Sequence, residues 1–347
     1  MQDLSAFLAT ITALRGISGD EGPVAAAIAE AFRPLCDAVE IDAMGSVIAR
    51  MGDHGPRVLM TAHEDEIGLM ATDVEEDGAV RFTRVGGVDP RILPGSRVTV
   101  HTEQGPMLGV VGALPPHLLS EEDRKQNYKM EKLHVDMGLP AERVRALVHP
   151  GTPITLYGPL KPYENGRFAG KTIDDRGCVA MMLRVAELLQ KRKLEAQVYF
   201  VAAVQEEVSG RGIETSAYRI DPDLGIAIDV THGEMPGCNP DSVHPLDKVV
   251  LSEGPNIHPR LHKHLMELAA RIHVDVKTSV CPGATATDAD GLQLARAGVP
   301  TALVELPLKY MHTTVEMYAE SALEEGARLL AAFVAGLDDQ WEELLCY

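Results

Sequence analysis

The chain has 347 residues and a formal net charge of −19 at pH 7, from 51 acidic and 32 basic side chains. This excess of negative charge disfavours nucleic acid as a partner, because binding to phosphates depends on clustered Lys and Arg. The hydrophobic share of 45% and the charged share of 24% are typical of a globular protein. The length predicts one large domain or two domains of unequal size.

The longest apolar stretches, Val198–Val204 and Leu329–Leu337, are much shorter than the ~18 residues of a membrane-spanning helix. The first residues contain no basic segment followed by an apolar run and a small-residue cleavage site. We therefore expect no membrane partner and a cytoplasmic location. The five cysteines are scattered and form no CxxC pair, which argues against a disulfide framework and against a thiolate zinc site.

The first 70 residues predict two helices and two strands. Apolar residues recur at helical spacing over residues 4–14 and again over residues 24–32, with Ser18-Gly19-Asp20 between them. Residues 46–50 and 57–62 are short apolar segments that predict strands. The second of these segments is almost continuously apolar, as expected for a strand covered on both faces.

Residues 71–166 have a different character. Glycine and proline are frequent here, and short alternating runs occur at Arg97–His101 and Leu108–Val111. Residues Glu121–Lys132 form a charged excursion within this stretch. We therefore predict a small β-rich, barrel-like domain inserted into the chain.

Strands and helices alternate after Gly170. Helices are predicted near residues 178–191, 261–272 and 315–337, and strands near residues 198–204, 224–229 and 301–306. This alternation is typical of a mainly parallel sheet flanked by helices. The predicted fold class is an α/β/α domain built from residues 1–70 and 167–347, interrupted by the inserted domain of residues 71–166.

Polar side chains follow the predicted strands of this α/β domain. They are His63, the pair Glu206-Glu207, Asp229 and His312, and a further pair, Asp174-Asp175, precedes a helix. Because the carboxyl ends of parallel strands meet at one edge of a sheet, where ligands usually bind, we expect these groups to lie close together.

Each group alone also has a simpler structural explanation. An Asp before a helix, such as Asp174, is usually an N-cap. A pair such as Glu206 and Glu207 usually lies on a solvated face, and a single histidine is more often a hydrogen-bonded structural residue. The joint placement at one sheet edge favours a functional site. Two adjacent carboxylates after a buried strand would also repel one another, and cations would relieve that repulsion.

The candidate ligands are nitrogen and oxygen donors without sulfur. They are His63, Asp174, Glu207, Asp229 and His312. This mixture suits Zn²⁺, and Co²⁺ or Mn²⁺ are also plausible. Five protein ligands exceed the three that a single catalytic zinc needs, so we predict two metal ions that share one carboxylate.

Six motifs occur in a specific order along nearly the whole chain. They are HEDEIG at 63–68, GKTIDDR at 170–176, QEEVSGRG at 205–212, DVT at 229–231, TDA at 287–289 and KYMH at 309–312. This order resembles the M42 family of dinuclear metallo-aminopeptidases, also described as TET-type or glutamyl aminopeptidases and, for some members, as endoglucanase M.

The resemblance implies a role for each candidate residue. One metal would be bound by His63 and Asp229, the other by Glu207 and His312, and Asp174 would bridge the two. Glu206 would be the general base, and Asp65 would be the carboxylate that orients the site. The Asp174–Asp175 peptide bond would be cis.

The resemblance also implies a reaction and an assembly. The enzyme would hydrolyse the N-terminal peptide bond of short peptides, with a metal-bridging water that gives its proton to the Glu general base. Dimers would form through residues 71–166 and associate into a dodecamer. Residue spacing alone leaves open a related di-metal carboxypeptidase or deacylase. A catalytically silent peptide-binding or assembly protein is an alternative from another class.

Several positions depart from the usual family pattern. They are Glu64, Ser209-Gly210, Lys309 and the Thr285–Ala289 loop. None removes a proposed ligand, but they leave the substrate pocket and the preferred N-terminal residue open. The substitution of Lys309 for a usual Arg replaces a planar fork with a point charge.

Other histidines match no ligand position. His258, His262 and His264 lie close together in the sequence, and we predict a surface cluster, because Pro259 makes a helix through His258 and His262 doubtful. His117 and His232 lie near family motifs without matching a ligand.

Overall fold

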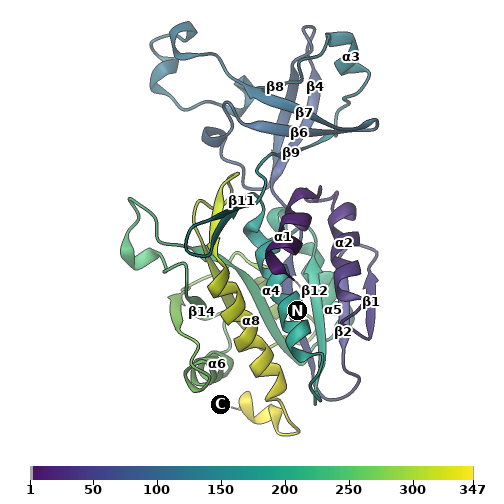
Figure 1. Cartoon of the computed structure of the whole chain (residues 1–347), viewed down its shortest axis with the longest axis vertical. Helices are drawn as coiled ribbons and strands as arrows, with labels where there is room; N and C mark the ends of the chain where they lie inside the picture. Colours follow the sequence, from purple (N-terminus) through teal and green to yellow (C-terminus); the bar gives the residue numbers. More distant parts are fainter. Residues whose placement is uncertain (1–2, 347) are drawn as a thin grey trace. The chain divides into compact units, whose positions relative to one another are not determined.

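A computed structural model describes residues 3–346 of the chain (Figure 1). Contacts between residues divide the chain into two compact units. Unit 1 consists of Met1–Asp65, Pro159–Met311 and Val315–Tyr347, and unit 2 consists of Glu66–Gly158 and His312–Thr314.

Unit 1 is built on an eight-stranded sheet with the order β1-β2-β12-β3-β13-β16-β14-β15. The strands are β1 (Ala38–Ile41), β2 (Val47–Met51), β3 (Arg57–His63), β12 (Gln197–Ala203), β13 (Leu224–His232), β14 (Val249–Glu253), β15 (Val276–Val280) and β16 (Thr301–Leu308). The four central strands β12, β3, β13 and β16 are parallel, whereas β2 and β14 pair with them in antiparallel fashion. The predicted α/β class with a mainly parallel centre is confirmed.

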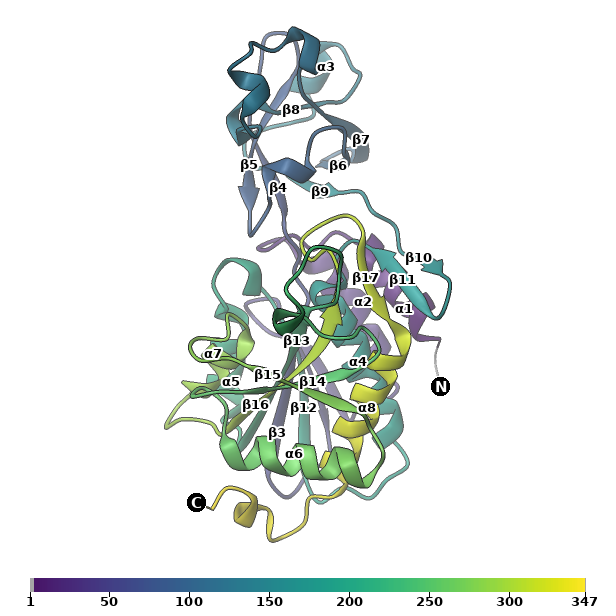
Figure 2. The same cartoon turned by 90° about the vertical axis from the view of Figure 1, so that its left-hand side faces the viewer.

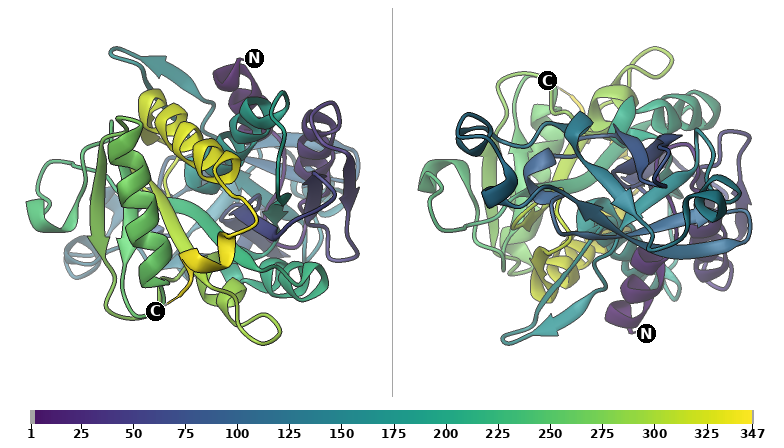
Figure 3. Two further views of the ribbon diagram at one scale, coloured as in Figure 1. Left: turned by 90° about the horizontal axis from the view of Figure 1, so that it is seen from below. Right: turned by 90° about the horizontal axis from the view of Figure 1, so that it is seen from above.

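Helices cover both faces of this sheet (Figures 1 and 2). They are α1 (Leu4–Ala13), α2 (Gly22–Phe32), α4 (Ile173–Leu189), α5 (Arg211–Ile220), α6 (Pro259–Arg271), α7 (Asp288–Gln293) and α8 (Glu320–Ala335). The larger core lies between the sheet and α1, α2, α4, α6 and α8, and it contains Leu224, Ile226, Ile228 and Val230 of β13. Two smaller clusters lie on the opposite face with α5 and α7. In Figure 3, α6 and α8 lie next to each other on the first face, where they are in contact.

The last predicted helix begins later than expected. Residues Glu316–Ala319 form strand β17, and the helix α8 starts only at Glu320. Strand β17 pairs with β11 (Arg167–Gly170), which pairs in turn with β10 (Lys161–Tyr163). The prediction was wrong for these four residues because their hydrogen-bond partners come from a distant part of the sequence.

Unit 2 is a closed barrel with the strand order β4-β5-β8-β7-β6-β9. Its elements are β4 (Gly68–Val74), β5 (Val80–Val85), β6 (Arg97–Thr102), β7 (Gly105–Gly112), β8 (His134–Asp136), α3 (Ala141–Arg145) and β9 (Pro153–Leu156). Alternating strand residues such as Val98 and Val100 are fully buried inside it. The predicted barrel-like domain is confirmed. Across residues 3–346, no helix is long and apolar enough to cross a membrane.

Candidate metal centre

Three adjacent parallel strands bring polar side chains to one edge of the unit 1 sheet. His63 is the last residue of β3, Asp229 lies in β13, and the turn Glu206–Val208 follows β12. Strand β3 is hydrogen-bonded to β12 on one side and to β13 on the other. The predicted convergence of these groups therefore follows from strand order and register.

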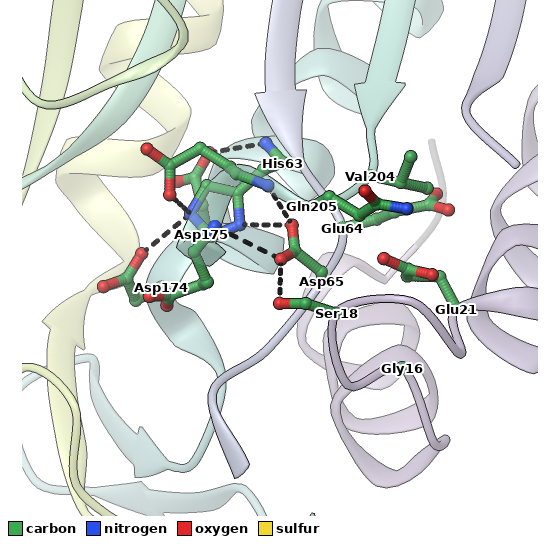
Figure 4. A network of polar contacts seen from close by, with 12 residues as sticks. Gly16, Ser18, Glu21, His63, Glu64, Asp65, Asp174, Asp175, Val204 and Gln205 are labelled. Atoms are coloured by element: carbon green, nitrogen blue, oxygen red, sulfur yellow. Dashed lines mark hydrogen bonds and ion pairs between the residues drawn. The ribbon is translucent and has the colours of Figure 1, made fainter. Parts of the chain in front are cut away.

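His63, Asp174 and Asp229 form a buried group of potential metal ligands. One ligand atom of each lies within 4.8 Å of those of the other two. The Nε2 atom of His63 lies 3.1 Å from Oδ1 of Asp174, and its Nδ1 atom lies 3.4 Å from Oδ1 of Asp65 (Figure 4). A metal-binding histidine typically presents one ring nitrogen to the ion and the other to a carboxylate. This group therefore fits a divalent cation.

Asp174 lies in the first turn of α4, where the backbone departs from helical geometry. The Asp174–Asp175 peptide bond is cis, as the resemblance implied. Asp175 is fully buried and its Oδ2 atom accepts a hydrogen bond from the backbone N–H of His63 at 3.1 Å. The start of α4 is thereby joined to the end of β3.

Glu206 and Glu207 lie in a short turn that Asp65 holds. The Oδ1 atom of Asp65 accepts the backbone N–H of Glu206 at 3.0 Å, and its Oδ2 atom accepts that of Glu207 at 3.2 Å. The Oε2 atom of Glu206 lies 3.7 Å from Nε2 of His63. The Glu206 side chain is 17% exposed, so it borders the buried group while remaining accessible to solvent.

Burial and crowding of carboxyl groups perturb the protonation of the site. Burial, with repulsion from Asp288, Glu207 and Asp174, raises the pKa of Glu206 to about 8, although His63 opposes the shift. Burial and the neighbouring Asp175 raise the pKa of Asp229 well above its usual value. So many acids in one buried place are unfavourable unless a cation neutralises them. The electrostatics thus agree with the donor chemistry that a divalent metal requires.

His312, the remaining predicted ligand, belongs to unit 2. Its Nδ1 atom lies 3.2 Å from the backbone oxygen of Gly87, and its φ of 61° places the backbone in the left-handed region. A histidine that donates from Nδ1 to a carbonyl directs the lone pair of Nε2 outward, as ligating histidines commonly do. The pairing of His312 with Glu207 and Asp174 stays a prediction.

Three further histidines lie outside the proposed ligand set. His258 caps α6 and Pro259 is its first residue, so the helix begins there and is not interrupted. His262 is half-buried and its Nδ1 atom lies 2.9 Å from the carbonyl oxygen of Ser252, so the predicted surface cluster is wrong for this residue. Among the described residues, His258, His262 and His264 are in no metal-capable group.

Three buried residues around the site were missed as functional candidates. They are Arg176, Asp288 and Glu316. Arg176 and Asp288 lie within the motifs GKTIDDR and TDA, which offered a signal, whereas Glu316 lies in no motif. Thr61 donates a hydrogen bond to Asp288 at 2.7 Å, and burial raises the pKa of Asp288 to about 6.

The α/β fold with a buried group of potential metal ligands at one sheet edge is compatible with a metal-dependent hydrolase, and comparisons with known proteins identify the family. The model of the M42 glutamyl aminopeptidase family matches residues 45–329. A lysyl aminopeptidase from Pyrococcus furiosus is 35% identical over 93% of this chain and 94% of its own length. The chain belongs to the M42 aminopeptidase family and is a peptide-bond hydrolase.

Solved structures agree with this assignment. The crystal structure of a TET aminopeptidase from the marine sediment archaeon Thaumarchaeota archaeon SCGC AB-539-E09 matches with a TM-score of 0.92, 28% identity and 99% coverage of both chains. The TET1 peptidase of Pyrococcus horikoshii, which can assemble into a tetrahedron or a large octahedral shell, matches with a TM-score of 0.86 and 29% identity over 96% of this chain and 100% of that chain.

Proposed function

We propose that this protein is a di-metal aminopeptidase that removes the N-terminal residue of short peptides. His63 and Asp229 would hold one ion, Glu207 and His312 would hold the other, and Asp174 would bind both. The nitrogen and oxygen donors favour Zn²⁺, with Co²⁺ or Mn²⁺ as alternatives. When bound, such ions supply Lewis acidity, which lowers the pKa of water and polarises a carbonyl group.

The side chain of Glu206 would be the general base. It would take a proton from the attacking water and return it to the leaving amine. The observation that carries this role is the position of Glu206: its carboxylate lies 3.7 Å from the ring of His63, while Asp65 fixes its backbone. Asp65 would also hold the ring of His63 by its Nδ1 side, 3.4 Å away.

We infer the substrates, the assembly and the cellular location of this protein from its relatives. The P. furiosus relative is named a lysyl aminopeptidase and the family a glutamyl aminopeptidase, so we propose unblocked peptides as substrates without assigning the first side chain. The assembly of the P. horikoshii TET1 peptidase into a tetrahedron or a large octahedral shell supports a homo-oligomer of this chain. We propose that dimers form through residues 71–166 and build a dodecamer. We propose a cytoplasmic location.

The decisive experiment combines metal analysis with a blocked substrate. The zinc-loaded protein is expected to contain about two ions per chain and to cleave aminoacyl-p-nitroanilides but not their N-acetylated analogues. Cleavage of the blocked analogues would instead indicate a deacylase or a related hydrolase. Glu206→Gln should lower kcat by about 10² to 10⁴ while retaining the metal. The exposed Glu214→Gln on α5 is the matched control. Unchanged turnover of Glu206→Gln would overturn the proposed base.

A further inference from the structure

Asp65 contacts both halves of the proposed site. Its carboxylate is fully buried, lies 3.4 Å from the ring of His63, and accepts the backbone N–H groups of Glu206 and Glu207. One side chain therefore sets the position of a ligand, of the proposed base and of the residue after it. Any rotation of this carboxylate would move all three.

A serine from the N-terminal segment holds this carboxylate. The Oγ atom of Ser18 donates to Oδ2 of Asp65 at 2.5 Å, across 47 positions of sequence (Figure 4). Ser18 lies in a tight turn in which the N–H of Asp20 donates to the carbonyl of Ile17 at 2.7 Å. Gly19 has a φ of 89° and donates its N–H to Oε1 of Glu21 at 2.7 Å. The turn thus presents the Ser18 hydroxyl in a defined direction.

Arg176 anchors this segment to the site. Its fully buried guanidinium donates to the carbonyl oxygens of Ile11, Leu14 and Gly16 at 2.6, 3.0 and 3.3 Å. Its Nε atom donates to the carbonyl oxygen of Glu64 at 2.8 Å. Arg176 therefore joins the end of α1 to the residue between His63 and Asp65. A rigid, forked guanidinium can make all four bonds at once, which a lysine cannot.

The packing leaves no room for a side chain at Gly16. A Cβ atom there would lie 2.2 Å from Nη2 of Arg176 and 2.6 Å from Cγ1 of Val24. The segment from α1 to Ser18 is therefore fitted closely against Arg176. The family match begins at residue 45, so this segment lies outside the matched region although it touches the site.

We propose that Ser18 is a positioning residue for the proposed base Glu206, acting through Asp65, and that Arg176 anchors the segment that carries it. This inference rests on the proposed function of Glu206 and Asp65. Without the Ser18 hydroxyl, the Asp65 carboxylate loses its shortest hydrogen bond and can rotate away from the Glu206–Glu207 turn. The substrate itself need not touch Ser18.

Ser18→Ala tests the proposal, with Ser18→Thr as the variant that keeps the hydroxyl. A hydrogen bond to a carboxylate is strong enough that kcat should fall about 10- to 100-fold in Ser18→Ala. KM should change less than about twofold, and the metal content should stay at the wild-type value. Ser18→Thr should recover most of kcat. Amide hydrogen exchange over residues 205–208 of the metal-free protein should become faster in Ser18→Ala but not in Ser18→Thr.

Thr12→Val is the matched control. Thr12 is a buried residue of α1, and among the described hydrogen bonds its hydroxyl donates only to the carbonyl oxygen of Leu8 in the same helix, at 2.8 Å. The variant should lower stability without changing kcat or the exchange of residues 205–208. Arg176→Lys should speed exchange over residues 14–20 as well as 205–208. If Ser18→Ala keeps wild-type kcat and exchange while Glu206→Gln is inactive, the positioning role is overturned and the proposed function stands. If Glu206→Gln is fully active, the proposed function itself fails.

Discussion

Glu316 and Asp174 are joined by a hydrogen bond across 142 positions of sequence, with the Oε2 atom of Glu316 lying 3.2 Å from the backbone nitrogen of Asp174. The same oxygen accepts the N–H of Ile173 at 2.7 Å. Glu316 begins β17, and its pairing with Gly170 of β11 places the carboxylate at the start of α4. A buried anion at a helix N-terminus satisfies N–H groups that have no partner within the helix. It thereby fixes the backbone that carries the proposed bridging ligand.

Glu316→Gln is expected to weaken metal binding about tenfold or more. The amide keeps the size of the side chain but loses its charge, and residues that support metal ligands typically contribute this much to affinity. Competition with a chromogenic chelator measures the change. Glu325→Gln, on the partly exposed side of α8, is the control and should bind metal as the wild type does. Wild-type affinity in Glu316→Gln would contradict a supporting role.

Glu64→Met is expected to stabilise the protein by about 1 to 3 kcal/mol. Both carboxylate oxygens of Glu64 are buried without a hydrogen-bond partner among the described residues. Burial raises the pKa of Glu64 well above its usual value, although the nearby Arg176 opposes the shift. An apolar side chain of similar size removes this cost. Thermal unfolding of metal-free protein measures the effect. A loss of stability would show instead that Glu64 is an ionised partner of Arg176.

The sheet and the chemical nature of the site could be predicted from the sequence because both have local signals. A buried parallel strand is a short apolar run, and His63, Glu206 and Asp229 occur within or directly after such runs. Once the strands are parallel neighbours, the polar residues must share one edge. The type of potential metal ligand then follows from the residue types alone.

The residues that support the site had no such signal. Ser18 and Glu316 reach it from 47 and 142 positions away, and each resembles an ordinary turn or strand residue in its own segment. The same reason explains the error at residues Glu316–Ala319, where pairing with β11 overrides a helical pattern. Long-range hydrogen bonds are set by tertiary structure, so local periodicity does not reveal them.

Gly87→Ala is expected to reduce the metal content from about two ions to about one. A Cβ atom at Gly87 would lie 2.7 Å from Nδ1 and 2.8 Å from Cε1 of His312, so the ring would have to move. If His312 holds the second ion, that ion would be lost first. Elemental analysis after gel filtration measures the ratio. Gly283→Ala is the control, because a Cβ atom there meets nothing within 4 Å. Two retained ions in Gly87→Ala would contradict this prediction.

The stability of the metal-free protein is expected to fall as the pH rises from 5.5 to 8. Burial raises the pKa of Glu206 from 4.5 to about 8, so the folded state binds a proton that the unfolded state has released. The stability from this group is fully present below pH 4.5 and is lost as the pH rises through 8. For Glu206 alone, the loss over this interval is about 3 kcal/mol. The raised pKa of Asp288, about 6, acts in the same direction.

Calorimetry at both pH values, with and without zinc, measures this dependence. Zinc favours the ionised carboxylates, so the loaded protein should show a smaller fall in Tm than the chelated protein. Glu206→Gln should flatten the pH dependence of the metal-free form, because the amide does not titrate, whereas Glu214→Gln should leave it unchanged. A Tm of the metal-free protein that rises between pH 5.5 and 8 would contradict this prediction. It would mean that the protein alone stabilises the acids of the site in their charged form, so their burial would no longer argue for a bound cation.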